Sequence, residues 1–265
     1  MPWVDPADSS ADEVLSRVAA GSDLTLRYAD HPDGLIDVFF PPALGRPPIP
    51  AALVVILHGG FWRQEFDRTH LRPLAASLVR DGLVVATPEY RRGGGGWPAT
   101  GQDVATALAA TPELIERAAP GRIDPQRPSV LVGHSAGGQL ALWSGLRADP
   151  ATIARIVALA PVADLAYAAG AGMGDNAVQA LLGGEPADMP DAYAEADPLR
   201  LFPGRVPVTI VQGTADKQVT VAMNRGIAAR HAEVDYVELP GVDHFALIDP
   251  LSDAFRTQVL PRLCD

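Results

Sequence analysis

Short, continuous apolar runs recur along this chain, and most of them precede a longer segment in which apolar residues have helical spacing. The run at 52–57 carries no polar residue, which is typical of a strand buried on both faces of a sheet. Further strands are expected at 83–87, 129–132, 156–159, 206–211 and 234–239, and helices at 68–80, 99–118, 136–147, 219–231 and from about 251. This alternation predicts a mostly parallel central sheet with helices on both faces.

Two segments depart from that alternation. The stretches 24–28 and 35–40 alternate in polarity around Asp33-Gly34, which predicts an antiparallel edge hairpin. The segment 162–204 is rich in Ala, Gly, Asp and Pro and carries one short amphipathic piece at 177–182. We expect it to be a small cap within a single domain, 1–265, lying over the ligand site and influencing substrate choice. The alternative is a surface excursion that does not touch substrate.

The composition of the chain limits which partners it can bind and where in the cell it is expected. The 265 residues suffice for one large domain, and a net charge of −11 disfavours binding to nucleic acid or anionic lipid. No apolar run approaches the roughly 18 residues of a membrane span. The first residues have neither a basic start nor an apolar signal-peptide core, and the single cysteine, Cys264, excludes an intrachain disulfide. A cytoplasmic protein is therefore expected.

A nucleophile motif lies between the strand at 129–132 and the helix at 136–147. The residues Gly133-His134-Ser135-Ala136-Gly137 place a serine at a sharp turn from strand to helix, where bulky neighbours two positions away would collide. The helix that follows directs its free N–H groups and positive dipole end toward the place where an oxyanion would form. The motif predicts Ser135 as a nucleophile and the N–H of Ala136 as an oxyanion donor.

A serine needs a base, and the base needs a carboxylate to orient it. His244 follows the last predicted strand, and Asp216 follows the strand before it, so both belong to the same edge of the sheet. The order Ser, Asp, His is that of one fold of serine hydrolases. Asp243 and Asp164 are weaker candidates for the acid.

The segment His58-Gly59-Gly60-Phe61-Trp62 follows the strand at 52–57. Two glycines let the backbone approach a substrate, so the N–H of Gly60 or Phe61 is expected to join Ala136 in an oxyanion hole. The same glycines also suit a tight turn between strand and helix, and both interpretations can hold together. We expect His58 to brace the loop, and Trp62 and Phe245 to contact substrate.

These motifs together resemble the α/β-hydrolase superfamily over nearly the whole chain. More narrowly, residues 58–62 are similar to the His-Gly-Gly-aromatic-Trp signature of the kynurenine formamidase (arylformamidase) and related esterase branch, with Phe61 where that signature usually carries Tyr. The segments 89–92, 97–99 and 193–202 are also similar to that branch. The resemblance implies the α/β-hydrolase fold and serine hydrolysis, with formamide preference as a possible inheritance.

The expected activity is hydrolysis of carboxylic esters or aryl formamides of small molecules through an acyl-enzyme. A non-catalytic ligand-binding module on the same fold and a small peptidase-like hydrolase are the alternatives, the first because a fold by itself does not prove chemistry. Metal-ligand and phosphate-loop spacings are missing from the sequence, so no metal or cofactor is expected. The physiological substrate, the acyl chain length and the oligomeric state are left open.

Overall fold

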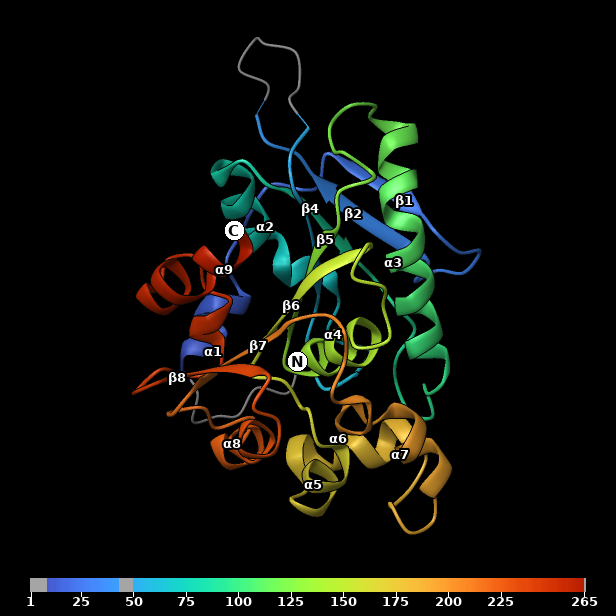
Figure 1. Ribbon diagram of the computed structural model, residues 1–265, viewed down its shortest axis with the longest axis vertical. Coiled ribbons are helices and arrows are strands. Elements are labelled where there is room, and N and C mark those ends of the chain that lie inside the picture. Colours follow the sequence, from blue (N-terminus) through green and yellow to red (C-terminus); the bar gives the residue numbers. More distant parts are fainter. Residues whose placement is uncertain (1–8, 43–49, 265) are drawn as a thin grey trace.

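Eight strands form one twisted sheet in a computed structural model that describes residues 9–42 and 50–264 (Figure 1). Their order across the sheet is β1-β2-β4-β3-β5-β6-β7-β8. The pairs β1·β2 and β2·β4 are antiparallel and the other five are parallel. The strands are β1 (Leu24–Arg27), β2 (Leu35–Phe39), β3 (Leu53–Leu57), β4 (Val84–Pro88), β5 (Ser129–His134), β6 (Ile153–Leu159), β7 (Val208–Gly213) and β8 (Val234–Leu239).

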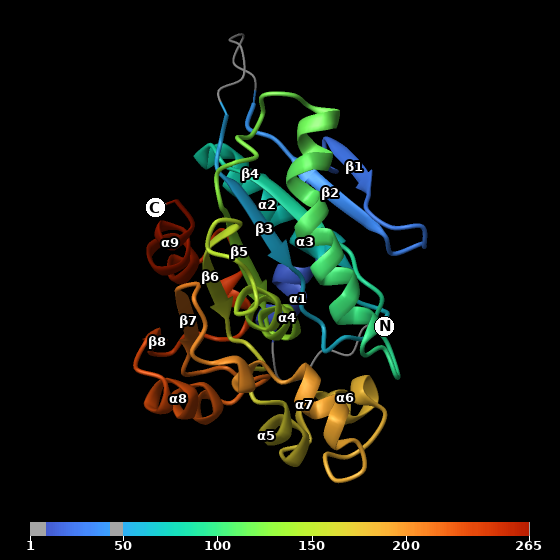
Figure 2. The ribbon, with the colours of Figure 1, turned by 45° about the vertical axis from the view of Figure 1, so that its right-hand side comes forward.

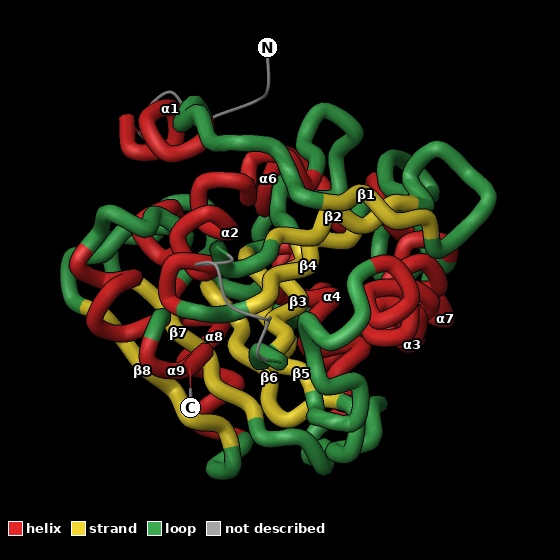
Figure 3. Tube along the Cα trace, turned by 90° about the horizontal axis from the view of Figure 1, so that it is seen from above, coloured by secondary structure: helices red, strands yellow, loops and turns green. Residues whose placement is uncertain are grey.

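Helices cover both faces of this sheet, as the view from above shows (Figure 3). The α-helices are α1 (Ser9–Leu15), α2 (Arg72–Leu78), α3 (Ala99–Ala118), α4 (Ala136–Gly145), α5 (Leu165–Gly170), α6 (Met173–Leu182), α7 (Pro190–Ala196), α8 (Val221–Arg230) and α9 (Pro261–Cys264). Successive residues of β3 point into two different cores: Leu53, Val55 and Leu57 pack with α3 and α4, while Val54 and Ile56 pack with α1 and α2. A strand buried on both faces needs this all-apolar composition.

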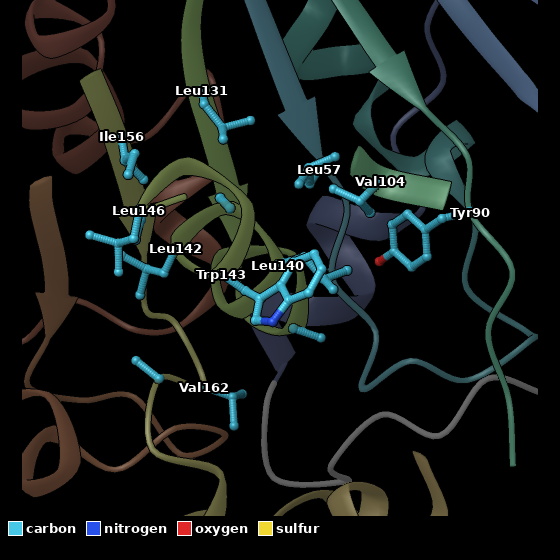
Figure 4. Packing of buried hydrophobic residues seen from close by; sticks show 14 of the residues in the cluster. Leu57, Tyr90, Val104, Leu131, Leu140, Leu142, Trp143, Leu146, Ile156 and Val162 are labelled. Carbon is cyan, nitrogen blue, oxygen red and sulfur yellow. The ribbon is translucent and has the colours of Figure 1, made fainter. Parts of the chain in front are cut away.

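Helix α4 lies at the centre of the molecule. All ten of its residues are buried, and Figure 4 shows Leu140, Leu142 and Trp143 directed into the surrounding core. The Trp143 indole nitrogen donates to the Glu195 carbonyl oxygen at 2.7 Å, which joins α4 to α7. Because the helix cannot shift without disturbing packing on every side, its amino-terminal end is held in a fixed place.

The segment 162–204 forms three short helices, α5, α6 and α7, and the 3-10 turn η3 (Pro198–Leu201). It therefore contains more helix than the single amphipathic piece that the sequence indicates. In Figure 2 these helices gather beyond the end of the sheet toward which the arrow of β3 points. The cap thus lies at the carboxyl edge of the parallel strands.

The predicted mostly parallel sheet, its covering helices and the antiparallel hairpin at its edge are confirmed. Some elements differ from the prediction: β6 begins three residues earlier, where Ser129 pairs with Ile153 before a register shift, and the helix predicted at 68–80 is divided into η1 (Arg68–Leu71), α2 and η2 (Val79–Asp81). The expectation that the chain lacks a signal peptide rests on residues 1–8, which lie outside the described residues. Within the described residues, none of the helices combines the length and apolar character that crossing a membrane requires.

Candidate active site

Ser135 lies at the turn between β5 and α4. Its backbone has φ 57° and ψ −119°, a conformation that L side chains rarely adopt, and its N–H donates to Leu159 O at 2.9 Å. A strained residue of this kind persists only where surrounding packing holds it, and such positions cluster at functional sites. The residue is 3% exposed, and it lines a pocket at the carboxyl edge of the sheet.

The glycines around the serine allow chain segments to touch. A Cβ on Gly133 would lie 2.1 Å from Gly137 O, and a Cβ on Gly137 would lie 2.2 Å from Leu57 O. Neither distance is compatible with a side chain, so only glycine permits α4 to begin directly against β5 and β3. The close approach predicted from the sequence is therefore present at both flanking positions.

His244 and Asp216 meet at the same edge. His244 Nδ1 lies 2.7 Å from Asp216 Oδ2, and both side chains are buried. Because the carboxylate accepts, Nδ1 carries the proton and Nε2 is the nitrogen with a free lone pair. His244 also lines the pocket that contains Ser135.

Asp216 is held in its charged form by several donors. Its Oδ1 accepts from the N–H groups of Gln218 and Val219, each at 2.8 Å, and its Oδ2 accepts from Gln212 Nε2 at 3.0 Å. Burial alone would raise the pKa of Asp216, but the neighbouring His244 and these hydrogen bonds lower it below its usual value. The carboxylate is thus ionised at neutral pH.

Backbone contact brings the two loops together. A Cβ on Gly213 would lie 2.1 Å from Val242 O, and that same carbonyl accepts from the Ala215 N–H at 3.0 Å. The loop after β7 therefore lies directly on the loop after β8. This contact explains how residues 28 positions apart in the chain share a hydrogen bond.

The alternative acids have structural partners. Asp243 Oδ1 accepts from the N–H groups of Phe245 and Ala246 at 2.9 Å, and Asp164 caps α5 by accepting from the Tyr167 N–H. Each carboxylate thereby stabilises a turn or a helix start. Asp216 is the one whose side chain meets His244.

His134 supports His244 from below. Its Nε2 donates to the His244 carbonyl oxygen at 3.0 Å, and the two ring centroids are 4.3 Å apart. Burial and the neighbouring His244 hold the pKa of His134 well below its usual value, so the ring is neutral. This role was not predicted, because no local pattern around position 134 indicates a contact with residue 244.

The loop that follows β3 has an unusual backbone. Gly60, Phe61 and Trp62 all have positive φ, at 107°, 49° and 54°. A Cβ on Gly59 would lie 2.9 Å from His134 O, which places this loop directly against the serine turn. Gly60 and Phe61 line the pocket with Ser135, and Ala136 lies at the first position of α4 beside them.

His58 braces that loop, as expected. Its Nδ1 donates to Gly59 O and its Nε2 donates to Glu89 Oε1, each at 2.8 Å. Burial would raise the pKa of Glu89, but the bond from His58 and the charge of Arg92, whose Nη1 lies 2.6 Å away, lower it to about 2. Both bonds together fix the orientation of the His58 ring at the start of the loop.

The pocket has an empty volume of about 500 Å³, its open mouth included. Its lining combines apolar walls with the reactive groups: Leu15, Gly59, Gly60, Phe61, Arg63, Phe66, His70, His134, Ser135, Gln218, His244 and Phe245. Phe245 is among these wall residues, and its contact with substrate stays a prediction. Burial lowers the pKa of His70 to about 4, which adds a neutral ring rather than a charge to the wall.

Trp62, which was expected to contact substrate, lies outside the pocket. Trp62 is buried in the core, where its Nε1 donates to Gln139 Oε1 at 3.2 Å, and it does not line this pocket.

The cap reaches the site through Gly174, whose carbonyl accepts from Arg63 Nη2 and whose Cα packs on the Phe61 ring. It therefore supports the loop at 60–63 rather than forming the pocket wall. Leu15, Phe66 and Gln218 line the pocket without having been predicted.

Across residues 9–42 and 50–264, no group of three His, Cys, Asp or Glu side chains is arranged to hold a metal ion. The polar groups at the pocket include the hydroxyl of Ser135, the imidazole of His244 paired with Asp216, and the backbone of the neighbouring loops. Their arrangement suits nucleophilic attack on a carbonyl carbon, with charge accepted by the backbone of residues 60, 61 and 136.

Comparison with protein-family profiles finds one family that matches most of the chain. The profile of the BD-FAE family matches residues 36–230, more than half of the chain. A search of the curated proteins found no match.

Solved structures share the fold over most of the chain. Esterase B from Lactobacillus rhamnosis aligns with a TM-score of 0.71 at 19% identity, covering 96% of this chain and 89% of that one. The butyrate-bound thermophilic esterase Est2 from Thermogutta terrifontis aligns with a TM-score of 0.64 at 20% identity, covering 90% and 91%. A bifunctional GH43-CE protein from Bacteroides eggerthii aligns at 0.71 and 18% identity over 90% of this chain, which spans 37% of that protein's length. These likenesses show the α/β-hydrolase fold.

Proposed function

Because the chain belongs to the BD-FAE family, we propose that it is a serine esterase that cleaves carboxylic esters of small molecules through an acyl-enzyme intermediate. One observation carries this proposal. The His244–Asp216 pair and Ser135 line or adjoin one pocket, and the serine is held at a strained turn against a loop of positive φ. The esterases among the structural neighbours are consistent with it.

Acylation follows from the roles that the geometry allows. Ser135 Oγ attacks the ester carbonyl carbon while His244 Nε2 accepts the hydroxyl proton, and Asp216 stabilises the imidazolium that forms. The tetrahedral oxyanion accepts hydrogen bonds from the N–H of Ala136 and of Gly60 or Phe61. Collapse breaks the bond to the alcohol oxygen, which takes the proton from His244 as the alcohol leaves.

Deacylation repeats the sequence with water. His244 Nε2 accepts a proton from the attacking water, the same donors stabilise the second oxyanion, and the proton returns to Ser135 Oγ as the carboxylic acid leaves. The buried position of Asp216 and its four accepted hydrogen bonds keep the imidazole in one orientation throughout. Neither half-reaction needs a group beyond these residues and water.

The test compares wild type with Ser135→Ala on p-nitrophenyl acetate and p-nitrophenyl butyrate. We expect Ser135→Ala to lower kcat by on the order of 10⁴-fold or more, with circular dichroism unchanged. A phenylphosphonate probe should add one mass increment to the peptide that contains Ser135. Turnover retained by Ser135→Ala contradicts the proposal, and so does wild type that binds esters without hydrolysing them, which would indicate a ligand-binding module.

Aryl formamides are a second proposed substrate class, since the same chemistry cleaves an activated formamide. The aromatic side chains of Phe61, Phe66 and Phe245 in the pocket wall suit an aromatic leaving group. We expect N-formylkynurenine to be hydrolysed in a Ser135-dependent manner. A kcat/KM below that of p-nitrophenyl butyrate by more than about 10³-fold would restrict the enzyme to esters.

A further inference from the structure

The carboxyl end of α1 reaches the pocket. Leu15 is the last residue of α1, and it lines the same pocket as Ser135 and His244. The other apolar wall residues, Phe61, Phe66 and Phe245, come from loops at the carboxyl edge of the sheet. A side chain from a remote part of the chain thus completes the apolar wall.

Burial holds α1 against the segment that follows His244. Ala11 and Val14 are buried, and Val14 belongs to the same apolar cluster as Leu247 and Ile248. The 3-10 turn η4 (Phe245–Leu247), on which α1 packs, begins directly after His244. The helix therefore contacts both the pocket and the loop that carries the proposed base.

An ion pair fastens the chain just after α1. Arg17 Nη2 lies 2.8 Å from Asp249 Oδ2, and the two side chains are only 20% and 13% exposed. The same nitrogen reaches Glu13 Oε1 at 3.1 Å, and the other Asp249 oxygen accepts from the Leu251 N–H. A charge-assisted bond at this level of burial is less screened than a surface pair, so it resists opening.

We infer that α1 is part of the substrate site and that Leu15 limits the length of the apolar group that an ester can place in the pocket. Arg17, through Asp249, is the positioning residue that keeps Leu15 in place. The inference rests on the proposed esterase function. It assigns an acyl or alkyl size limit to a residue outside the triad, the oxyanion loop and the cap.

The first test varies the size of residue 15. Wild type, Leu15→Ala and Leu15→Trp are assayed on p-nitrophenyl esters from acetate to octanoate and on acetates from ethyl to octyl. Each added methylene that finds apolar contact is worth about four-fold, or ~0.8 kcal/mol, so Leu15→Ala should raise the octyl-to-short kcat/KM ratio by about ten-fold or more in one series. Leu15→Trp should lower that ratio.

The matched control is Val18→Ala, because the Val18 side chain is 98% exposed and does not line the pocket. It should keep the wild-type chain-length profile. Profiles that run parallel for wild type and both Leu15 variants, in both ester series, overturn the inference. The Trp variant keeps the test decisive where Leu15→Ala fails to fold, since it adds apolar volume instead of removing it.

The second test examines the ion pair between Arg17 and Asp249. Arg17→Gln frees Leu15, so it should raise the octyl-to-short kcat/KM ratio in the same direction as Leu15→Ala, through a lower KM for the longer esters more than through kcat, and it should speed amide hydrogen exchange across residues 9–15. Arg17→Lys keeps the charge and should restore slow exchange. Exchange in α1 that is the same in all three proteins overturns the positioning role.

The outcomes separate this inference from the proposed function. Absence of Ser135-dependent hydrolysis in wild type removes the esterase proposal, and hydrogen exchange then decides by itself whether Arg17 clamps α1. Serine-dependent hydrolysis with unchanged chain-length profiles leaves the esterase proposal standing and removes the role of Leu15.

Discussion

The imidazole of His58 stacks on the phenol ring of Tyr90, with centroids 4.3 Å apart and planes within 8°. The Tyr90 hydroxyl donates to the His58 carbonyl oxygen at 2.6 Å, so ring and backbone of the same histidine are both fixed. With Nε2 bonded to Glu89 and Nδ1 bonded to Gly59 O, His58 has one accessible orientation. His58, the residue at which the proposed oxyanion loop begins, is therefore rigidly held and buried.

Replacement of Glu89 tests whether the fixed position of His58 matters for activity. Glu89→Gln leaves the guanidinium of Arg92, whose side chain is 8% exposed, without its buried counter-ion, which costs on the order of 3 kcal/mol of stability. We expect kcat to fall by roughly 10²-fold, because the donors of the oxyanion hole lose their fixed geometry, while KM changes little. Urea unfolding and steady-state kinetics measure the two effects. Unaltered kcat in a destabilised variant would show that the network serves folding alone.

Asp216→Asn should act on chemistry with little effect on the fold. An amide favours the wrong tautomer of His244 and stabilises the imidazolium poorly, so we expect kcat to fall by on the order of 10⁴-fold. Asp243→Asn is the matched control, because its Oδ1 caps a turn and an amide oxygen accepts the same two bonds. Equal losses in the two variants would argue against Asp216 as the orienting acid.

Gly133→Ala should disrupt the serine turn. The added Cβ would lie 2.1 Å from Gly137 O and 2.8 Å from Ala141 Cβ, so α4 must move away from β5. We expect loss of several kcal/mol of stability and of measurable turnover. Gly170→Ala, at a position with no atom within 4 Å and no positive φ, should change the melting temperature little. A stable, active Gly133→Ala protein would contradict the close packing at the turn.

Asp197 makes stability depend on pH. Burial raises the pKa of Asp197 to about 6, above the unfolded value of 3.8, so the folded protein binds the proton more tightly. Its stabilising contribution is present below pH 4 and is lost as pH rises through 6, at a cost of about 3 kcal/mol above that pH.

Asp197→Asn provides the measurement. The neutral amide keeps an oxygen to accept from the Leu199 N–H at the start of η3, and it carries no charge to bury. The variant should therefore exceed wild type in unfolding free energy at pH 8 and match it near pH 4, measured by urea titration. A constant difference between the two proteins across that range would contradict the titration of Asp197.

The features that were predicted correctly depend on interactions between residues close together in the chain, or on the topology of a parallel sheet. The apolar run of β3, the glycines flanking Ser135 and the order Ser, Asp, His each depend on neighbours in the chain or on the common edge of a parallel sheet. The sequence therefore indicated the sheet, the turn and the residues now found around one pocket. The role of His58 in bracing the loop before Gly59 and Gly60 was also expected from the sequence.

Long-range contacts were not readable in this way. The place of Leu15 in the pocket depends on where α1 docks, and the short apolar face formed by Ala11 and Val14 carries no pattern that identifies its partner. Trp62 points into the core because three successive positive φ angles turn the loop, a backbone path that composition does not reveal. The bond from His134 to the His244 carbonyl likewise depends on the fold of a loop 110 residues later.

The ion pair between Arg17 and Asp249 joins residues separated by 232 positions. During synthesis α1 leaves the ribosome long before Asp249 is made. The segment on which α1 packs is therefore missing until nearly all of the described chain has emerged. Contacts of such separation form late, since the intervening chain must first be ordered. We therefore expect the pocket wall at Leu15 to be among the last parts of the molecule to form, and a nascent chain to hold a folded sheet while the proposed substrate site is still open.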